Sequence, residues 1–203
     1  MIKKLFVWWF TFDHIDEPGI KDRGLYDVHL RLLRRCIEYQ HLWCETIQQD
    51  NNGNLTKDSN KGISNIAYNV LNLPSTVTFS DGSTITYSYA ADGTKLRTVH
   101  TISGTTTTKD YCANVVYENG VQKMLLTEEG YVDLSASTST YYYYLKDHQG
   151  NNRVVINGSG TVVETNHYYP FGGVFASTGN VQPYKYNGKE LDTKKGLNWY
   201  DYG

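Results

Sequence analysis

The residue pair with the most obvious chemical potential is Asp147 beside His148, because a carboxylate can orient an imidazole for proton transfer. Consecutive residues of a strand point to opposite faces, so the two side chains could not form a dyad within a strand. The following Gly150 is typical of a turn. We therefore expect Asp147 to cap this turn and His148 to be packed or exposed, with no catalytic role.

Glu190 and Asp192 are a second candidate, since residues two apart share one face of an extended strand, as the paired carboxylates of a glycosidase require. Nothing else in the sequence builds a sugar site, and we expect both to be solvated turn residues. The sequence contains no Gly-x-Ser-x-Gly elbow, no phosphate-binding Gly-x-x-x-x-Gly-Lys-Ser/Thr loop and no His-Glu-x-x-His motif. We predict that the chain is not an enzyme and has neither catalytic nor cofactor-binding residues.

A metal site is the third possibility, because His29, Cys36, His41 and Cys44 offer the imidazole and thiolate ligands that zinc prefers. Structural zinc sites bring together two closely spaced ligand pairs, and only His41 and Cys44 are so placed. We predict no metal site. With Cys112 the cysteines number three, too few for a disulfide framework, and the redox compartment stays undecided.

Composition excludes two further classes. A formal net charge of -2 gives no electrostatic reason to expect a nucleic-acid partner. No apolar stretch approaches the roughly 20 residues that span a bilayer. Lys3 and Lys4 followed by Leu5–Phe12 imitate a secretory signal, but Asp13 begins an acidic segment where a small-residue cleavage site should lie. We therefore recognise no convincing signal peptide.

A change of composition near residue 49 divides the chain. Residues 1–49 contain three of the four Trp residues but only two of the 18 Gly residues. Between Leu25 and Ile47 the apolar residues follow a helical stripe, and arginines occupy much of the other face. We predict one amphipathic helix there. We favour its packing on the neighbouring sheet over binding to a membrane surface or a partner's groove.

From residue 50 onward, turn signals alternate with short β-branched or aromatic runs. The six strongest signals are Asn-Gly or Asp-Gly pairs, for which we expect type I′ hairpin turns with positive φ at both positions. They are Asn52-Gly53, Asp81-Gly82, Asp92-Gly93, Asn119-Gly120, Asn157-Gly158 and Asn187-Gly188. The spacing predicts antiparallel strands over residues 60–200. Loose repeats about 20 residues apart indicate stacked units that cannot bury their own apolar faces alone.

The motifs in this region resemble one family. The recurring Tyr-x-Tyr, Gly, polar, Leu, Thr pattern looks like the YD repeat of Rhs and teneurin-type proteins, and residues 141–203 resemble the Rhs repeat-associated core. Four blocks, at residues 146–153, 168–172, 184–192 and 196–203, carry the likeness in the family's order. The matching residues, assigned a structural role, are Tyr144, Lys146, Asp147, His148, Gly150, Arg153, Tyr169, Pro170, Phe171, Gly172, Gly188, Lys189, Glu190, Asp192, Gly196, Leu197, Tyr200, Asp201, Tyr202 and Gly203.

The resemblance implies a mainly β protein: a YD-repeat antiparallel sheet forming part of a wound β shell, with an N-terminal helical segment. In several members of the family the shell encloses a toxic C-terminal segment that the core cuts free. We expect residues 1–49 to be a non-family segment, residues 50–140 degenerate YD repeats, and residues 141–203 a core truncated before the family's self-cleavage motif. A truncated or rearranged gene product is one reading of this organisation.

Two functions follow as expectations. The first is a non-catalytic fragment of an Rhs shell that encapsulates or presents a C-terminal toxin, or belongs to a cell-surface protein; its partners would be the remaining shell or the toxin. The alternative is a module that binds carbohydrate or protein through a tyrosine-rich sheet face. Secretion or cell-surface location is implied by the resemblance alone.

The expected truncation also implies unpaired strand edges that recruit other chains. The run Thr140–Leu145 is uncharged, free of Pro and Gly, and rich in β-forming residues, so we expect it to be the segment most prone to association. A Tyr142→Lys change should then reduce association if that side chain faces solvent.

Overall fold

The computed structural model describes residues 46–202. The chain divides into two compact units, residues 1–46 and 47–203, and the description below concerns the second. The helix expected between Leu25 and Ile47 lies outside the described residues but for its last two positions, and the four residues tested for zinc lie outside them entirely. No helix in the described part of the chain is long and apolar enough to cross a membrane.

The second unit is mainly β, which confirms the predicted fold class. Fourteen strands form one antiparallel meander in which each strand pairs with its sequence neighbours. They are β1 (Ile47–Gln49), β2 (Leu55–Asp58), β3 (Ile63–Tyr68), β4 (Pro74–Phe79), β5 (Thr84–Tyr89), β6 (Lys95–Ile102), β7 (Thr105–Cys112), β8 (Val115–Glu118), β9 (Val121–Leu126), β10 (Gly130–Asp133), β11 (Thr140–Lys146), β12 (Asn152–Asn157), β13 (Val162–Tyr168) and β14 (Val174–Thr178).

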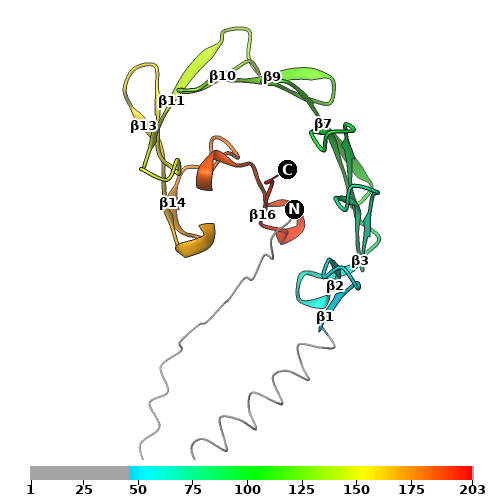
Figure 1. The fold of residues 1–203 in the computed structure, drawn as a ribbon. Coiled ribbons are helices and arrows are strands. Elements are labelled where there is room, and N and C mark those ends of the chain that lie inside the picture. The colour runs from blue at the N-terminus through cyan, green and yellow to red at the C-terminus, as the bar shows by residue number, and fades with distance from the viewer. Residues whose placement is uncertain (1–45, 203) are drawn as a thin grey trace, which may run out of the picture. The chain divides into compact units, whose positions relative to one another are not determined.

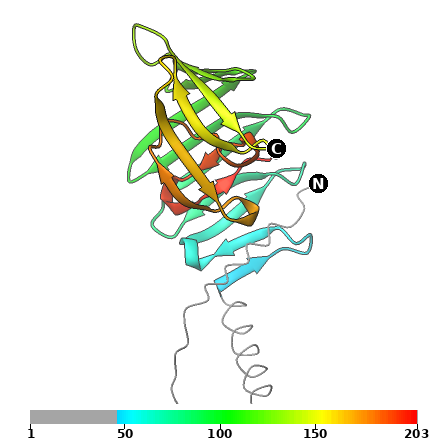
Figure 2. The same ribbon diagram turned by 90° about the vertical axis from the view of Figure 1, so that its left-hand side faces the viewer.

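The sheet is strongly curved. In Figure 1 it runs as an arc from β1 through β9 and β10 to β14, and the C-terminal segment lies on its concave side. Figure 2 shows the same strands following one another along the arc, with the C-terminal segment behind the yellow and orange strands. We call residues 181–202 the strap. It contains a separate two-stranded sheet, β15 (Leu191–Asp192) with β16 (Trp199–Tyr200), that does not join the large sheet.

The hairpin loops differ from the prediction. At Asp81-Gly82, the Gly82 N–H donates to the carbonyl of Phe79 at 3.0 Å and the Phe79 N–H to that of Ser83 at 2.9 Å, with only Gly82 at positive φ (82°). This is a three-residue loop in which a type I turn precedes a left-handed glycine. Of the six pairs, only Asn119-Gly120 and Asn187-Gly188 have positive φ at both positions. The type I′ prediction was therefore wrong for the other four.

The first half of the arc holds the hydrophobic core, and the strap completes it. Ile63, Val77 and Ile85 from β3, β4 and β5 are fully buried, and Leu197 of the strap is fully buried against the same cluster. Trp199 packs on its edge. A single-layer sheet cannot bury its own apolar face, so the strap supplies the second layer.

The tyrosine-rich strand β11 lies inside the sheet, paired with β10 on one side and β12 on the other. Its backbone is therefore not an edge of the sheet, and the expected association through Thr140–Leu145 stays a prediction that would have to use its exposed side chains. Tyr142 is half-buried and stacks on Tyr131, with ring centroids 4.7 Å apart, so it does not face solvent. Tyr141 and Tyr143 are the exposed tyrosines of this strand.

Gly130 offers a test of the β10–β11 pairing. A Cβ at this position would lie 2.0 Å from the Tyr142 carbonyl oxygen and 2.8 Å from the Cα of Tyr143, so Gly130→Ala must push the two strands apart. We expect the free energy of unfolding, measured by urea titration, to fall by roughly 2 to 3 kcal/mol.

The matched control is Gly158→Ala. A Cβ there would lie at an ordinary 3.8 Å from the Tyr141 carbonyl oxygen. This change should stay within about 0.5 kcal/mol of the wild type. Equal stability of the two variants would contradict the pairing described for β10 and β11.

Candidate functional site

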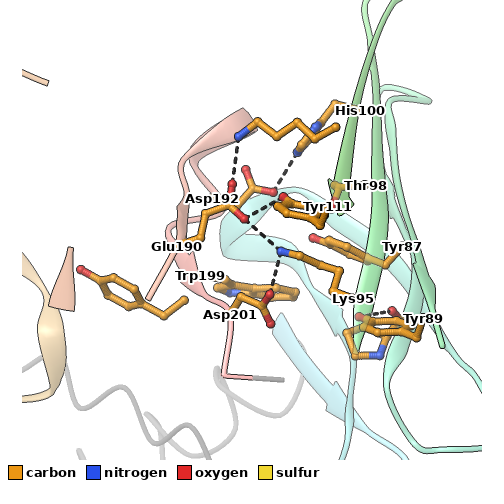
Figure 3. Close-up of a pocket in the computed structure, with 13 residues that line it drawn as sticks. Tyr87, Tyr89, Lys95, Thr98, His100, Tyr111, Glu190, Asp192, Trp199 and Asp201 are labelled. Atoms are coloured by element: carbon orange, nitrogen blue, oxygen red, sulfur yellow. Dashed lines mark hydrogen bonds and ion pairs between the residues drawn. The ribbon is translucent and has the colours of Figure 1, made fainter. Parts of the chain in front are cut away.

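The most concentrated set of charged groups lies where the strap crosses β6 and β7, around the buried carboxylate of Glu190 (Figure 3). One oxygen, Oε1, is 2.9 Å from the Nζ of Lys109, and the other, Oε2, is 3.0 Å from the Nζ of Lys95. The Tyr111 hydroxyl donates to Oε2 at 2.7 Å. Three donors from two adjacent strands therefore hold one side chain of the strap.

Asp192 makes a parallel link. Its Oδ2 lies 2.8 Å from the Nε2 of buried His100 on β6, and its Oδ1 accepts a hydrogen bond from the Lys194 N–H. The expectation that Glu190 and Asp192 are solvated turn residues was wrong. Their partners lie about 80 to 95 residues earlier in the chain, where sequence reasoning had no means of finding them.

The ionic cluster determines the protonation of its members. Burial alone would raise the pKa of Glu190, but the ammonium groups of Lys109 and Lys95 and the Tyr111 hydroxyl outweigh it and lower this pKa to about 2. Burial would likewise lower the pKa of Lys95, but Glu190 and Asp201, whose Oδ2 is 2.7 Å from the Lys95 Nζ, raise it. The carboxylate and the ammonium are therefore both charged at neutral pH.

A second buried ion pair holds the beginning of the strap, and in this pair the strap carries the positive charge. Glu164 of β13 is fully buried, and its Oε1 lies 2.6 Å from the Nζ of Lys185 on the strap. It also accepts hydrogen bonds from the Val181 N–H and from the side-chain amide of Gln182, at 2.8 and 2.9 Å. Here the sheet provides the anion and the strap the cation. Because the first anchor has the reverse arrangement, the strap cannot bind in the opposite direction without placing like charges together.

The cluster around Glu190 encloses a cavity of about 90 Å³. Pockets for small organic ligands are usually several times larger, roughly 300 to 1,000 Å³. The carboxylates that line it, Glu190, Asp192 and Asp201, each have a cationic or imidazole partner. Within residues 46–202 no group of three or more His, Cys, Asp or Glu side chains could hold a metal ion. The arrangement is suited to fastening the strap.

The residues of the first motif block stabilise the turn after β11. The Asp147 Oδ1 accepts hydrogen bonds from the N–H groups of Gln149 and Asn151, in agreement with the expected capping role. His148 is exposed. Arg153 pairs with Asp147 at 3.5 Å.

Two further residues of this block are Gly150, inside the turn, and Lys146, directly before it. Gly150 has φ of 80°, the conformation that favours glycine. The Lys146 ammonium donates to the Glu128 carbonyl at 2.9 Å and lies 5.8 Å from the ring centroid of Tyr144.

The second block separates into exposed and buried residues. Tyr169, Pro170 and Phe171 are exposed on the η2 turn (Pro170–Gly172). Gly172 is buried, and a Cβ there would lie 2.9 Å from the ring of Tyr186. The Tyr200 hydroxyl donates to the Gly172 carbonyl at 2.8 Å, so this turn also holds the strap.

The last two blocks form the strap itself. Gly188 in the η3 turn (Tyr186–Gly188) and Gly196 in the η4 turn (Lys194–Gly196) have φ of 66° and 71°. The Lys189 ammonium lies 5.7 Å from the ring centroid of Tyr202. Gly203 lies outside the described residues.

No protein-family model and no curated protein match this chain. Solved structures of Tc toxin components do resemble it in fold. A crystal structure of TcdB2-TccC3-TEV matches with a TM-score of 0.58 and 19% identity, covering 70% of this chain and 8% of that one. The structure of TcdB2-TccC3 without its hypervariable C-terminal region gives a TM-score of 0.57 at 18% identity, covering 70% and 8%.

The Photorhabdus luminescens Tc holotoxin pore with a mutated TccC3 gives a TM-score of 0.60 at 20% identity and covers 76% of this chain and 9% of that one. The chain thus spans less than a tenth of the length of these structures. At such identities the likeness concerns the fold.

The Glu190 anchor predicts a specific acid dependence of stability. Its pKa rises from about 2 in the folded state to its ordinary value of 4.5 on unfolding. The stabilisation is therefore complete above pH 4.5 and is lost as the pH falls toward 2. Glu190→Gln should lower the free energy of unfolding by about 3 kcal/mol at pH 7, and the difference from the wild type should shrink steadily between pH 4.5 and 2.5.

Urea titrations at pH 7, 5, 4 and 3 measure this dependence. Glu129→Gln, at an exposed position, is the control and should parallel the wild type at every pH. If the difference in free energy of unfolding between Glu190→Gln and the wild type stayed constant down to pH 3, the Glu190 carboxylate would not be what holds the two ammonium groups.

Proposed function

We propose that the chain is a wall segment of a β shell: a non-catalytic structural piece of the Rhs type, which encloses or presents a C-terminal toxin or forms part of a cell-surface protein. The observation that carries this proposal is the curved antiparallel meander fastened to an internal strap by buried ionic anchors. Its partners would be the rest of such a shell or the enclosed toxin. Secretion or exposure at the cell surface belongs to the same proposal.

Two further points support a structural role. The carboxylates of the Glu190 cluster each pair with a cationic or imidazole group, an arrangement that suits a structural link better than catalysis. The chain resembles in fold 8 to 9% of the length of the Tc toxin structures. A short match to much longer chains supports the proposal that this chain forms one section of a longer wall.

The alternative function is a face that binds carbohydrate or protein. It would need exposed tyrosine rings, whereas a structural role allows the rings to pack within the protein. Tyr87 packs on the hydrophobic core, Tyr111 binds Glu190, and Tyr131 stacks on Tyr142. These rings on the concave side are committed to the protein's own packing, so they support the structural role over stacking on a sugar.

Hydrogen exchange of the full chain tests the proposal. In a wall whose strap is a permanent layer, amides of the strap and of β3 to β6 should share one protection free energy and one dependence on urea. If the strap instead exchanged far faster than the sheet, it would be a lid over a binding site, and the wall function would be contradicted. A screen against glycans should find no binding.

We further expect no self-cleavage. An aspartyl site that cuts a peptide needs two carboxylates sharing a proton, whereas Asp192 and Asp201 each face a basic side chain. Intact mass after prolonged incubation at pH 5 and pH 7 should remain that of the full chain. A discrete fragment that disappears in Asp192→Asn or Asp201→Asn would refute this expectation.

A further inference from the structure

The last strand of the sheet, β14, has an open side. Within the described residues it pairs only with β13, and all five of its residues, Val174–Thr178, are exposed. The strand carries no charge and no proline, the two devices that usually protect such an edge. The opposite edge strand, β1, has only three residues and an irregular register between Gln48 and Gln49. The longer free edge is therefore β14, although its pairing with β13 also has a bulge, at Phe175.

An aromatic cluster adjoins this edge. Tyr169, Phe171 and Phe175 have exposed fractions of 58%, 86% and 54%. The Tyr169 and Phe175 rings lie 4.9 Å apart, and the ring of His167 lies 5.8 Å from that of Phe175. Scattered apolar side chains are normal at a protein surface, but grouped aromatic rings beside free backbone groups mark an interaction site.

The backbone of Phe171 strengthens this assignment. Its φ of 72° is a left-handed conformation that bulky residues rarely adopt, and it directs a nearly fully exposed ring away from the turn. The ring is exposed, so burial does not offset this strain. The conformation belongs to the turn that the hydrogen bond from the Gly172 N–H to the Tyr169 carbonyl closes, and it leaves the ring free to contact a partner. Backbone strain of this kind is concentrated at functional sites.

We propose that β14 and the aromatic cluster form the interface of a homodimer, in which β14 of one copy pairs antiparallel with β14 of a second copy about a two-fold axis. An unpaired strand edge is satisfied by another extended backbone. A two-fold axis at Ala176 places Val174 opposite Thr178 and Phe175 opposite Ser177 of the second copy. The strand is therefore compatible with itself, because no like charges oppose each other.

The size of the interface predicts its strength. Burying the three partly exposed rings would remove roughly 300 to 500 Å² of surface per copy. A standard stable interface removes about 800 Å² per partner. The dimer should therefore be weak, with a dissociation constant in the micromolar range. This inference does not depend on the proposed shell function.

Sedimentation velocity of the full chain from about 1 to 200 μM tests the interface. The wild type should shift from monomer to dimer over this range. Ala176→Lys places two ammonium groups at the axis and should raise the dissociation constant at least tenfold. Tyr143→Lys is the control, because Tyr143 is exposed on the interior strand β11, and it should dimerise as the wild type does.

Phe171→Gly separates dimerisation from folding. Glycine adopts the left-handed conformation without strain, so this variant should keep or raise the melting temperature while its dimerisation weakens severalfold. A wild type that stays monomeric at 200 μM would overturn the proposal. So would a dimer unaffected by Ala176→Lys.

Cross-linking locates the two-fold axis. Directly opposed residues of an antiparallel pair lie close enough for a disulfide, so Ala176→Cys, with the three native cysteines replaced by serine, should form covalent dimers on oxidation. Thr178→Cys in the same background should not, because the two copies of this residue would lie about 13 Å apart along the strands. Equal cross-linking at both positions would contradict the register.

Discussion

The buried carboxylate of Glu190, held by Lys95, Lys109 and Tyr111, is the interaction on which the rest of the structure depends. A long meander of single strands has no second layer of its own, and its apolar concave face needs one. The strap provides that layer, although its two short strands pair only with each other. The strap is therefore attached to the sheet largely through side chains, and Glu190 is the strap residue that binds two lysines and a tyrosine of the sheet.

Buried ion pairs contribute more to the choice of arrangement than to net stability, because the desolvation of both charges offsets much of their attraction. We infer that the two anchors of this protein act in this way. Glu190 reaches from the strap to lysines of the sheet, whereas Glu164 reaches from the sheet to Lys185 of the strap. Their opposite polarity fixes the direction of the strap. With the direction fixed, Leu197 is placed in the core between β3, β4 and β5.

The same construction gives the concave side of the sheet and its free edge different surroundings. The concave side is committed to the strap, and its tyrosines are partners in packing and hydrogen bonding. The groups left available for association lie elsewhere, at the free edge of β14 and in the aromatic rings beside it. The proposed wall function and the proposed edge contact use different surfaces, so the two proposals are compatible with each other.

The sequence by itself determined the local structure of the described region. Alternating β-branched and aromatic runs between Asn-Gly and Asp-Gly pairs predicted short antiparallel strands, because side-chain period and turn conformation are properties of a few adjacent residues. The capping role of Asp147 was predictable for the same reason. The turn types were less so, because a glycine that follows a type I turn and a glycine within a type I′ turn share the same dipeptide.

The tertiary structure alone decided which charges meet. Glu190 looked like a solvated turn residue because its partners, Lys95 and Lys109, are separated from it by 95 and 81 positions. Likewise the composition of Thr140–Leu145 indicated a segment prone to association, but only the tertiary structure shows that this run is paired on both sides and that β14 is an edge strand. Contacts between distant segments depend on how the sheet curves and where the strap crosses it, and no local pattern of residues encodes either.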